Sequence, residues 1–183
     1  LAPTIALGLT RRAEAGVTDP LNIIVCENLK NASQIFRGMV QEHLAPEYHP
    51  YLADYVGFVD TVIGRMVPLM PPELREKDPS LVIVEPYKEL PVSRSGFVGH
   101  IPSIVGMEPH DNFVAYVDRK LYVHNAGHAM LAYLGYRKGL EYGYEAMDDP
   151  DIYPVFSQAL DESRRALVSR HGLFQFFARR SPM

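Results

Sequence analysis

A short β-branched run between two helical patterns constrains the fold of this chain most strongly. Residues Leu21–Cys26 read Leu-Asn-Ile-Ile-Val-Cys and are bounded by turn-forming residues. Such a run is typical of a strand buried inside a parallel sheet. A helical pattern over residues 4–15 precedes it, and a second one follows Asn28 and extends to about Leu44. The order helix, strand, helix predicts a layered α/β domain.

The chain changes character near residue 108. Before that point, Leu81–Val84 and the less regular Leu90–Val92 are predicted as further strands, antiparallel and near a sheet edge. After it, we predict one helix from a cap at Asp111 to about Tyr133 and a second over Ile152–Leu167. The expected fold class is therefore α/β followed by all-α.

Composition limits the possible partners and the compartment. The chain has 183 residues, of which 47% are hydrophobic and 22% charged, and its formal net charge of −4 argues against a general nucleic-acid binder. Its longest apolar runs are too short to span a bilayer, so we expect no membrane partner. The lone Cys26 cannot form an internal disulfide, which favours the cytoplasm. Oligomeric state is left open.

Polar side chains interrupt the apolar face of the predicted helix over residues 111–133. The apolar stripe consists of Phe113, Val114, Val117, Leu121 and Leu131. At about 100° per residue, four polar side chains fall on or beside this stripe. They are Lys120, His124, Asn125 and His128. Burying such groups without partners costs several kcal/mol, so a cleft that uses them is a natural explanation.

Lys120, Asn125 and His128 together supply the parts needed to oxidise an alcohol. Burial lowers the pKa of a lysine and lets it act as a base near neutral pH. An amide one turn away can donate to an oxygen that gains negative charge, and an imidazole can orient or share the proton. The alternative is an ordinary amphipathic helix whose lysine reaches solvent. Asn125 and Gly127 are poor helix formers, which favours the functional interpretation.

The same helix also carries the spacing of a metal-binding pair. His124 and His128 have the i, i+4 spacing of a metal-binding pair. A third ligand would have to come from Asp118, His100 or His110, none of which has diagnostic spacing. We therefore expect no metal.

Two other places carry polar groups in apolar surroundings. Asn28 follows the predicted parallel strand, at the edge of the sheet where ligands gather, and can either reach a cofactor or cap the next helix. Asp60 and Arg65 lie close together in sequence, where a buried ion pair and a substrate-binding role are both open.

Three segments, in this order, resemble the polyol-specific long-chain dehydrogenases, also called the mannitol dehydrogenase family. They are Cys26–Leu29, Gly57–Pro68 and Arg119–Gly135, and the third is the most specific. The branch of mannitol-1-phosphate 5-dehydrogenases is the most similar one. The resemblance implies that residues 1–108 are the C-terminal part of a Rossmann-type cofactor domain. It also implies that residues 109–183 begin a helical substrate domain.

The resemblance implies a role for each matching residue. Lys120 would be a metal-independent general base, Asn125 would polarise the substrate oxygen, and His128 would hold the sugar chain. The implied substrate-binding residues are Asp60, His124 and Arg65, and the residues near the NAD cofactor are Asn28 and Glu27. The implied reaction is reversible hydride transfer between NAD and a polyol. In the phosphate branch it converts mannitol 1-phosphate to fructose 6-phosphate.

The sequence also departs from that family. No glycine-rich dinucleotide fingerprint precedes the first strand, so most of the NAD-binding half is expected to be missing. Gly64 stands where the family usually carries an aspartate. We therefore expect a fragment that is inactive alone. The alternatives are a mannitol 2-dehydrogenase that acts on free mannitol, a non-catalytic helical binding module, and a metal-dependent hydrolase that uses His124 and His128.

Overall fold

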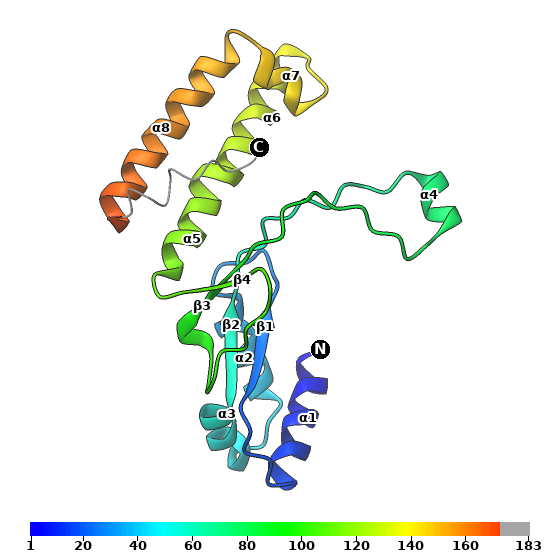
Figure 1. Cartoon of the computed structure of the whole chain (residues 1–183), viewed down its shortest axis with the longest axis vertical. Helices are drawn as coiled ribbons and strands as arrows, with labels where there is room; N and C mark the ends of the chain where they lie inside the picture. The colour runs from blue at the N-terminus through cyan, green and yellow to red at the C-terminus, as the bar shows by residue number, and fades with distance from the viewer. Residues whose placement is uncertain (173–183) are drawn as a thin grey trace. The chain divides into compact units, whose positions relative to one another are not determined.

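The computed structural model describes residues 1–172, which form two compact units (Figure 1). The first unit comprises Leu1–Phe113, and the helical unit runs from Val114 onward. The first unit begins with α1 (Ala2–Glu14), β1 (Leu21–Val25), α2 (Ala32–Glu42), η1 (Pro46–Tyr48), α3 (His49–Tyr55) and β2 (Val56–Asp60). The α/β layer, the first strand and its two flanking helices are therefore confirmed.

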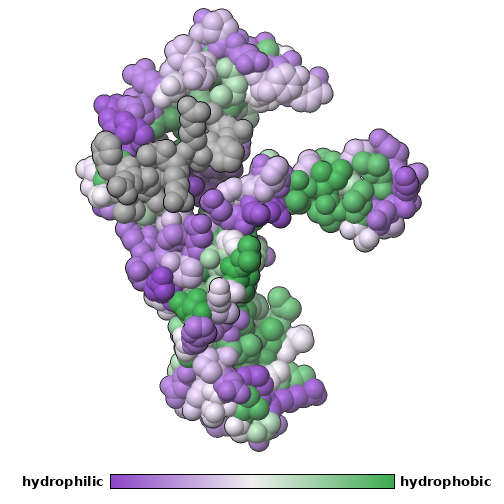
Figure 2. All heavy atoms as spheres, viewed as in Figure 1, coloured by the Kyte–Doolittle hydropathy of each residue, from purple (hydrophilic) through white to green (hydrophobic). Residues whose placement is uncertain are grey.

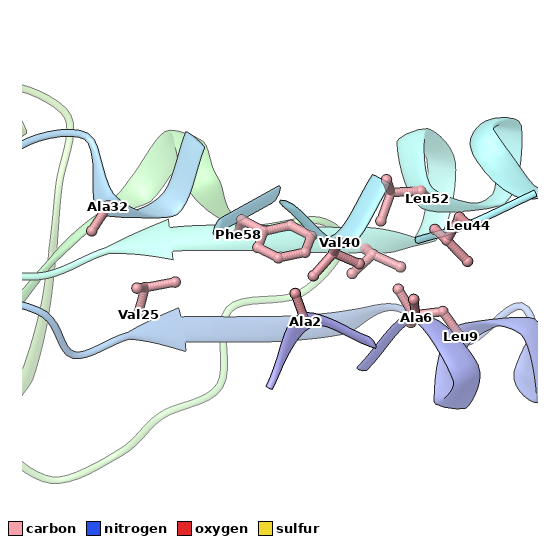
Figure 3. Packing of buried hydrophobic residues seen from close by; sticks show 10 residues of the cluster. Ala2, Ala6, Leu9, Val25, Ala32, Val40, Leu44, Leu52 and Phe58 are labelled. Atoms are coloured by element: carbon pink, nitrogen blue, oxygen red, sulfur yellow. The ribbon is translucent and has the colours of Figure 1, made fainter. Parts of the chain in front are cut away.

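The core of the first unit lies between one face of a two-stranded sheet and the helices that cover it. β1 and β2 are parallel, with Leu21 opposite Val56 and Val25 opposite Asp60. Figure 3 shows side chains from α1, α2 and α3 meeting those of the strands. The buried members are Ala2, Ala6, Leu9, Val25, Ala32, Val40, Leu44, Leu52, Val56 and Phe58. Val56 and Phe58 of β2 point to the same face of the sheet because side chains alternate between the two faces along a strand.

A returning segment closes the opposite face of this sheet. It contains the short helix η2 (Arg94–Gly96). A Cβ atom on Gly57 would lie 2.6 Å from the carbonyl oxygen of Gly96, so only glycine allows this approach. The Asn22 amide fixes the segment, because it donates to the carbonyl of Val98 (3.1 Å) and accepts from its N–H (2.8 Å).

Residues 62–89 leave the sheet and return to it, with α4 (Pro72–Lys77) at their far end (Figure 1). We call this excursion the arm. The predicted strand at Leu81–Val84 is wrong, because these residues have no ladder partner in the described chain and form no strand. The two legs of the arm contact each other where the Glu85 carboxylate accepts from the Met66 N–H. Figure 2 shows exposed apolar surface on the arm, where Leu69 is 99% exposed.

The second predicted strand is confirmed, but its pairing differs. β3 (Leu90–Ser93) pairs in parallel with β4 (Met107–His110), which was not predicted. The only antiparallel pairing described for β3 is a single bridge between Val92 and Thr61. The antiparallel arrangement expected for this strand is therefore wrong apart from that bridge.

The helical unit is built around one long helix with an irregular turn. α5 (Phe113–Arg119) continues into the π-helical turn η3 (Lys120–Asn125) and then into α6 (Ala126–Lys138). α6 ends at Gly139, whose φ of 75° is the left-handed value that glycine adopts at helix ends. Two further helices follow, α7 (Gly143–Asp148) and α8 (Ile152–His171). The predicted helices are confirmed, but the first extends five residues further and contains a π turn.

Glycines bring the helices of this unit close together. Gly127, Leu131 and Gly135 are the buried residues of α6. A Cβ atom on Gly127 would lie 3.3 Å from the Phe156 ring of α8, and one on Gly135 would lie 3.3 Å from Ala146 of α7. The buried cluster of Leu131, Ala146, Ile152 and Phe156 fills the space between the three helices. None of the helices in residues 1–172 combines the length and the apolar character needed to cross a bilayer.

Candidate active site

The π turn η3 coincides with the predicted catalytic segment. Lys120 is its first residue and Asn125 its last. Both residues are half-buried. A π turn replaces i→i+4 hydrogen bonds by i→i+5 bonds, is rare, and occurs frequently at functional sites. The local irregularity therefore lies where the sequence already placed the unusual residues.

Partial burial changes the acidity of Lys120. Desolvation lowers the pKa of its ammonium group below the ordinary value of 10.5. The cause is that a charged amine loses hydration when protein atoms surround it, which favours the neutral form. The direction of this shift is the one that a general base requires.

The two histidines of the segment do not lie on the buried face. His124 and His128 are exposed and contact each other edge to face, with their ring centroids 4.5 Å apart. Their predicted place on the buried stripe is wrong, and Leu121 is also 43% exposed. Buried positions in α6 are instead occupied partly by glycines, which contribute nothing to a hydrophobic pattern. Gly127 is accordingly explained by close packing with α8.

Asp118 is a buried ionisable residue that sequence analysis did not assign to the site. It is 3% exposed, and it is the only charged side chain among the buried polar residues of the described chain. Its Oδ2 lies 3.0 Å from Nε2 of His171 and 3.7 Å from Nε of Arg170. Both partners are more than 50 residues away in sequence, so no local spacing could have indicated this pair. In the described residues, no group of three or more histidine, cysteine, aspartate or glutamate side chains is arranged to hold a metal ion.

Asp60 has a structural partner in the first unit. Its Oδ1 accepts from the Ser33 N–H (2.9 Å) and its Oδ2 from the Ser33 hydroxyl (2.7 Å). Ser33 lies in the first turn of α2, where backbone N–H groups have no partner within the helix. Asp60 therefore satisfies the start of α2 from the end of the neighbouring strand.

Arg65 and Asp60 do not pair with each other, so the ion pair considered from the sequence is not formed. The Arg65 Nε donates to the carbonyl oxygen of Tyr87 on the other leg of the arm. A Cβ atom on Gly64 would lie 3.0 Å from the Tyr87 ring. The lack of a side chain at Gly64 therefore leaves room for the Tyr87 ring to pack there.

Residues Cys26–Asn28 are exposed just beyond β1. The proposed capping role of Asn28 is wrong, because α2 begins at Ala32 with Asn31 in the cap position. Asn31 adopts a left-handed conformation with φ of 59°, which asparagine tolerates better than most residues.

Comparison with known proteins decides the family. A family model described as the mannitol dehydrogenase Rossmann domain matches residues 1–106, and one described as the mannitol dehydrogenase C-terminal domain matches residues 112–177. The chain belongs to the mannitol dehydrogenase family. The Rossmann-type start and helical continuation that the sequence resemblance implied are thereby confirmed.

Two solved structures share this fold. One is the mannitol 2-dehydrogenase of Pseudomonas fluorescens in a ternary complex with NAD and D-mannitol, with a TM-score of 0.66, 23% identity and 91% of this chain covered. The other is a D-sorbitol dehydrogenase in substrate-free form, with a TM-score of 0.73, 20% identity and 91% covered. The present chain spans about two fifths of the length of each, 39% and 40% respectively.

Proposed function

We propose that this chain is part of an NAD-dependent polyol dehydrogenase that acts on a polyol phosphate. Residues 1–108 would be the C-terminal part of the cofactor domain, and residues 109–183 the start of the substrate domain. The observation that carries the proposal is Lys120, a half-buried lysine with a lowered pKa at the start of a π turn. Membership of the mannitol dehydrogenase family supplies the reaction class.

In the proposed reaction, the residues of η3 manage the proton and the charge on oxygen. Neutral Lys120 takes the proton of the substrate hydroxyl, and the electrons of that O–H bond form the C=O bond as the carbon loses hydride. The Asn125 amide donates a hydrogen bond to the oxygen while it carries negative charge. His128 and His124, which are exposed, hydrogen-bond to other hydroxyl groups of the sugar chain. NAD, when bound, supplies the acceptor for the hydride.

The first unit fits part of a dinucleotide. Its parallel strands end side by side at Val25 and Asp60, and Glu27 and Asn28 are exposed at that edge. Ligands of open α/β sheets bind at such carboxyl ends. The first turn of α2 does not suit a phosphate, because the carboxylate of Asp60 already accepts from its N–H group. We therefore assign Glu27 and Asn28 to the cofactor and leave the pyrophosphate to residues outside α2.

Replacing Lys120 tests the general base. In the complete protein that carries these residues, Lys120→Ala should lower turnover of mannitol 1-phosphate about 10²- to 10⁴-fold, the usual contribution of a general base. The KM for NAD should change little. Arg137→Ala, an exposed residue of α6, is the control and should keep normal turnover. If Lys120→Ala retained nearly full turnover, Lys120 would not be the base.

Free mannitol is the second candidate substrate, because one of the similar structures is a mannitol 2-dehydrogenase. We favour the phosphate because the three segments Cys26–Leu29, Gly57–Pro68 and Arg119–Gly135 together are most similar to the phosphate branch. A direct comparison of kcat/KM for mannitol and mannitol 1-phosphate separates the two. A preference for free mannitol would overturn the choice of substrate and leave the role of Lys120 intact.

We also propose that these 183 residues alone do not turn over either polyol, and that the protein works in the cytoplasm. Steady NADH formation by the isolated chain would contradict the first statement. A non-catalytic binding module is the remaining alternative. It predicts that replacing Asn125 and His128 together by alanine leaves polyol oxidation by the complete protein unchanged, whereas our proposal predicts a large loss.

A further inference from the structure

We propose that Asp118 and His171 form a positioning pair that fixes the π turn carrying Lys120. The pair acts through the backbone of the long helix and does not itself touch substrate. The catalytic consequence rests on the proposed role of Lys120, but the structural consequence does not.

The pair is short and nearly inaccessible to water. The Asp118 and His171 side chains are only 5% and 8% exposed, and their Oδ2 and Nε2 atoms are 3.0 Å apart. A carboxylate at this depth is costly unless a partner compensates it. Arg170 contributes a charge at 3.7 Å, but its side chain is 66% exposed, so solvent screens much of its effect.

The pair joins the end of α8 to α5, just before the π turn η3. Asp118 precedes the first residue of η3 by two positions, and His171 is the last residue of α8. α8 packs along η3 and α6, and Figure 1 shows it running beside them. At the far end, Lys138 of α6 binds Asp149, which accepts from the Ile152 N–H (3.0 Å) at the start of α8. The long helix is therefore tied to α8 on both sides of the π turn.

The need for such a tie follows from the π turn itself. A π-helical turn is intrinsically less favourable than an α-helical one, so it persists only where surrounding contacts determine it. Gly127 fixes the helix after the turn by packing against Phe156. Asp118 and His171 fix the helix before it. With Asp118 and Gly127 both held on α8, the six residues of η3 between them have little freedom to relax into a regular helix.

Hydrogen–deuterium exchange on the 183-residue chain tests the structural claim without catalysis. His171→Leu introduces an apolar side chain of similar bulk and removes the hydrogen-bond donor to Asp118. We expect amide exchange in a peptide covering residues 118–126 to become at least tenfold faster, with peptides of α7 little changed. His171→Gln, whose Nε2 can replace the ring donor, should restore most of the protection. Asp161→Asn removes an exposed ion-pairing carboxylate from α8 and should have no effect on this peptide.

Two outcomes would overturn the proposal. One is unchanged exchange at residues 118–126 in His171→Leu. The other is equally faster exchange throughout the helical unit, which would make the pair a general stabiliser. In the complete protein, His171→Leu should lower kcat at least fivefold and shift its pH profile, with little change in the KM for NAD. If exchange is faster in His171→Leu but the unmodified complete protein oxidises no polyol, the proposed function is refuted and the positioning pair is still supported.

Discussion

Different interactions stabilise the interior of the first unit and the interior of the helical unit. In the first unit, aliphatic side chains fill the space between sheet and helices, and it contains the largest fully buried side chains described, Leu9, Leu52, Val40, Val59 and Val92. In the helical unit, Gly127 and Gly135 let the helices approach each other beside a small apolar cluster, and a buried ion pair joins the ends of two helices. The comparison shows that a hydrophobic pattern does not identify the buried face of a helix such as α6, where glycines occupy buried positions.

The largest stability effect is expected in the aliphatic core. Leu52 is 1% exposed, so Leu52→Ala should lower the free energy of unfolding of the first unit by about 2–5 kcal/mol through lost contacts and a cavity. Urea denaturation followed by exchange at β1 and β2 measures it. Leu29→Ala, at a residue that is 58% exposed, is the control and should have little effect. Equal losses in the two variants would contradict the described core.

A smaller stability effect is expected at Gly127, where the lack of a side chain lets α6 approach α8. Gly127→Val places methyl groups against Phe156 and should destabilise this unit by about 1–3 kcal/mol through overpacking. Gly8→Val makes the same change in α1, where nothing lies within 4 Å of the new Cβ atom, and should not destabilise the protein. Chemical denaturation of both variants tells whether close approach or helix propensity decides. A stable Gly127→Val variant would show that α8 is free to move away.

Removing a part-buried hydrogen bond in the first unit should lower its stability less than truncating its core, and more than removing an equivalent exposed hydrogen bond. Ser33→Ala removes the hydroxyl donor to Asp60 and should cost about 1–3 kcal/mol, because Oδ2 of the carboxylate loses its partner. Ser80 makes the same pair of bonds to Asp78 on the exposed arm, so Ser80→Ala is the matched control. Thermal unfolding compares them, and a loss at Ser80 as large as that at Ser33 would contradict the role of burial.

The smallest effect is expected from pH, at the ion pair between Lys138 and Asp149. The hydrogen bond from Lys138 lowers the pKa of Asp149 below 3.8, so its stabilisation is present above pH 3.8 and is lost as pH falls through the folded-state pKa. Asp149 in turn raises the pKa of Lys138 above 10.5, so that part is lost only at higher pH. At pH values below 3.8, the midpoint temperature of unfolding of the helical unit should decrease slightly. The decrease should be smaller in Lys138→Gln. Identical acid profiles for the two proteins would show that the pair contributes nothing.

Helices and the first strand could be predicted because their patterns are local. The strand predicted at Leu81–Val84 was wrong because β-branched residues favour a ladder but cannot supply a partner. β2 was missed because a five-residue strand with Gly57 in it follows α3 without a loop, and its glycine is explained only by the segment that packs on it. Strand formation here depends on residues distant in sequence.

The features of the candidate site likewise differ in whether a local sequence pattern could predict them. Lys120 and Asn125 stood out because polar and poorly helical residues interrupt a regular pattern, and the structure places them at the two ends of η3. The exposure of His124 and His128 could not be predicted, since the buried face of α6 includes Gly127 and Gly135. The link between Asp118 and His171 spans 53 residues and carries no periodic signal.

The π turn of η3 sets the angular phase of everything that follows it. An i→i+5 turn accommodates one more residue than an α-helical turn, so α6 is offset by roughly 100° from a regular continuation of α5. Deleting one residue of the turn, such as Val123, would let α5 continue into α6 as a regular helix, with Gly127 still facing the Phe156 ring. The π turn therefore lets the chain carry one extra residue between Lys120 and Asn125 while the same face of α6 packs on α8.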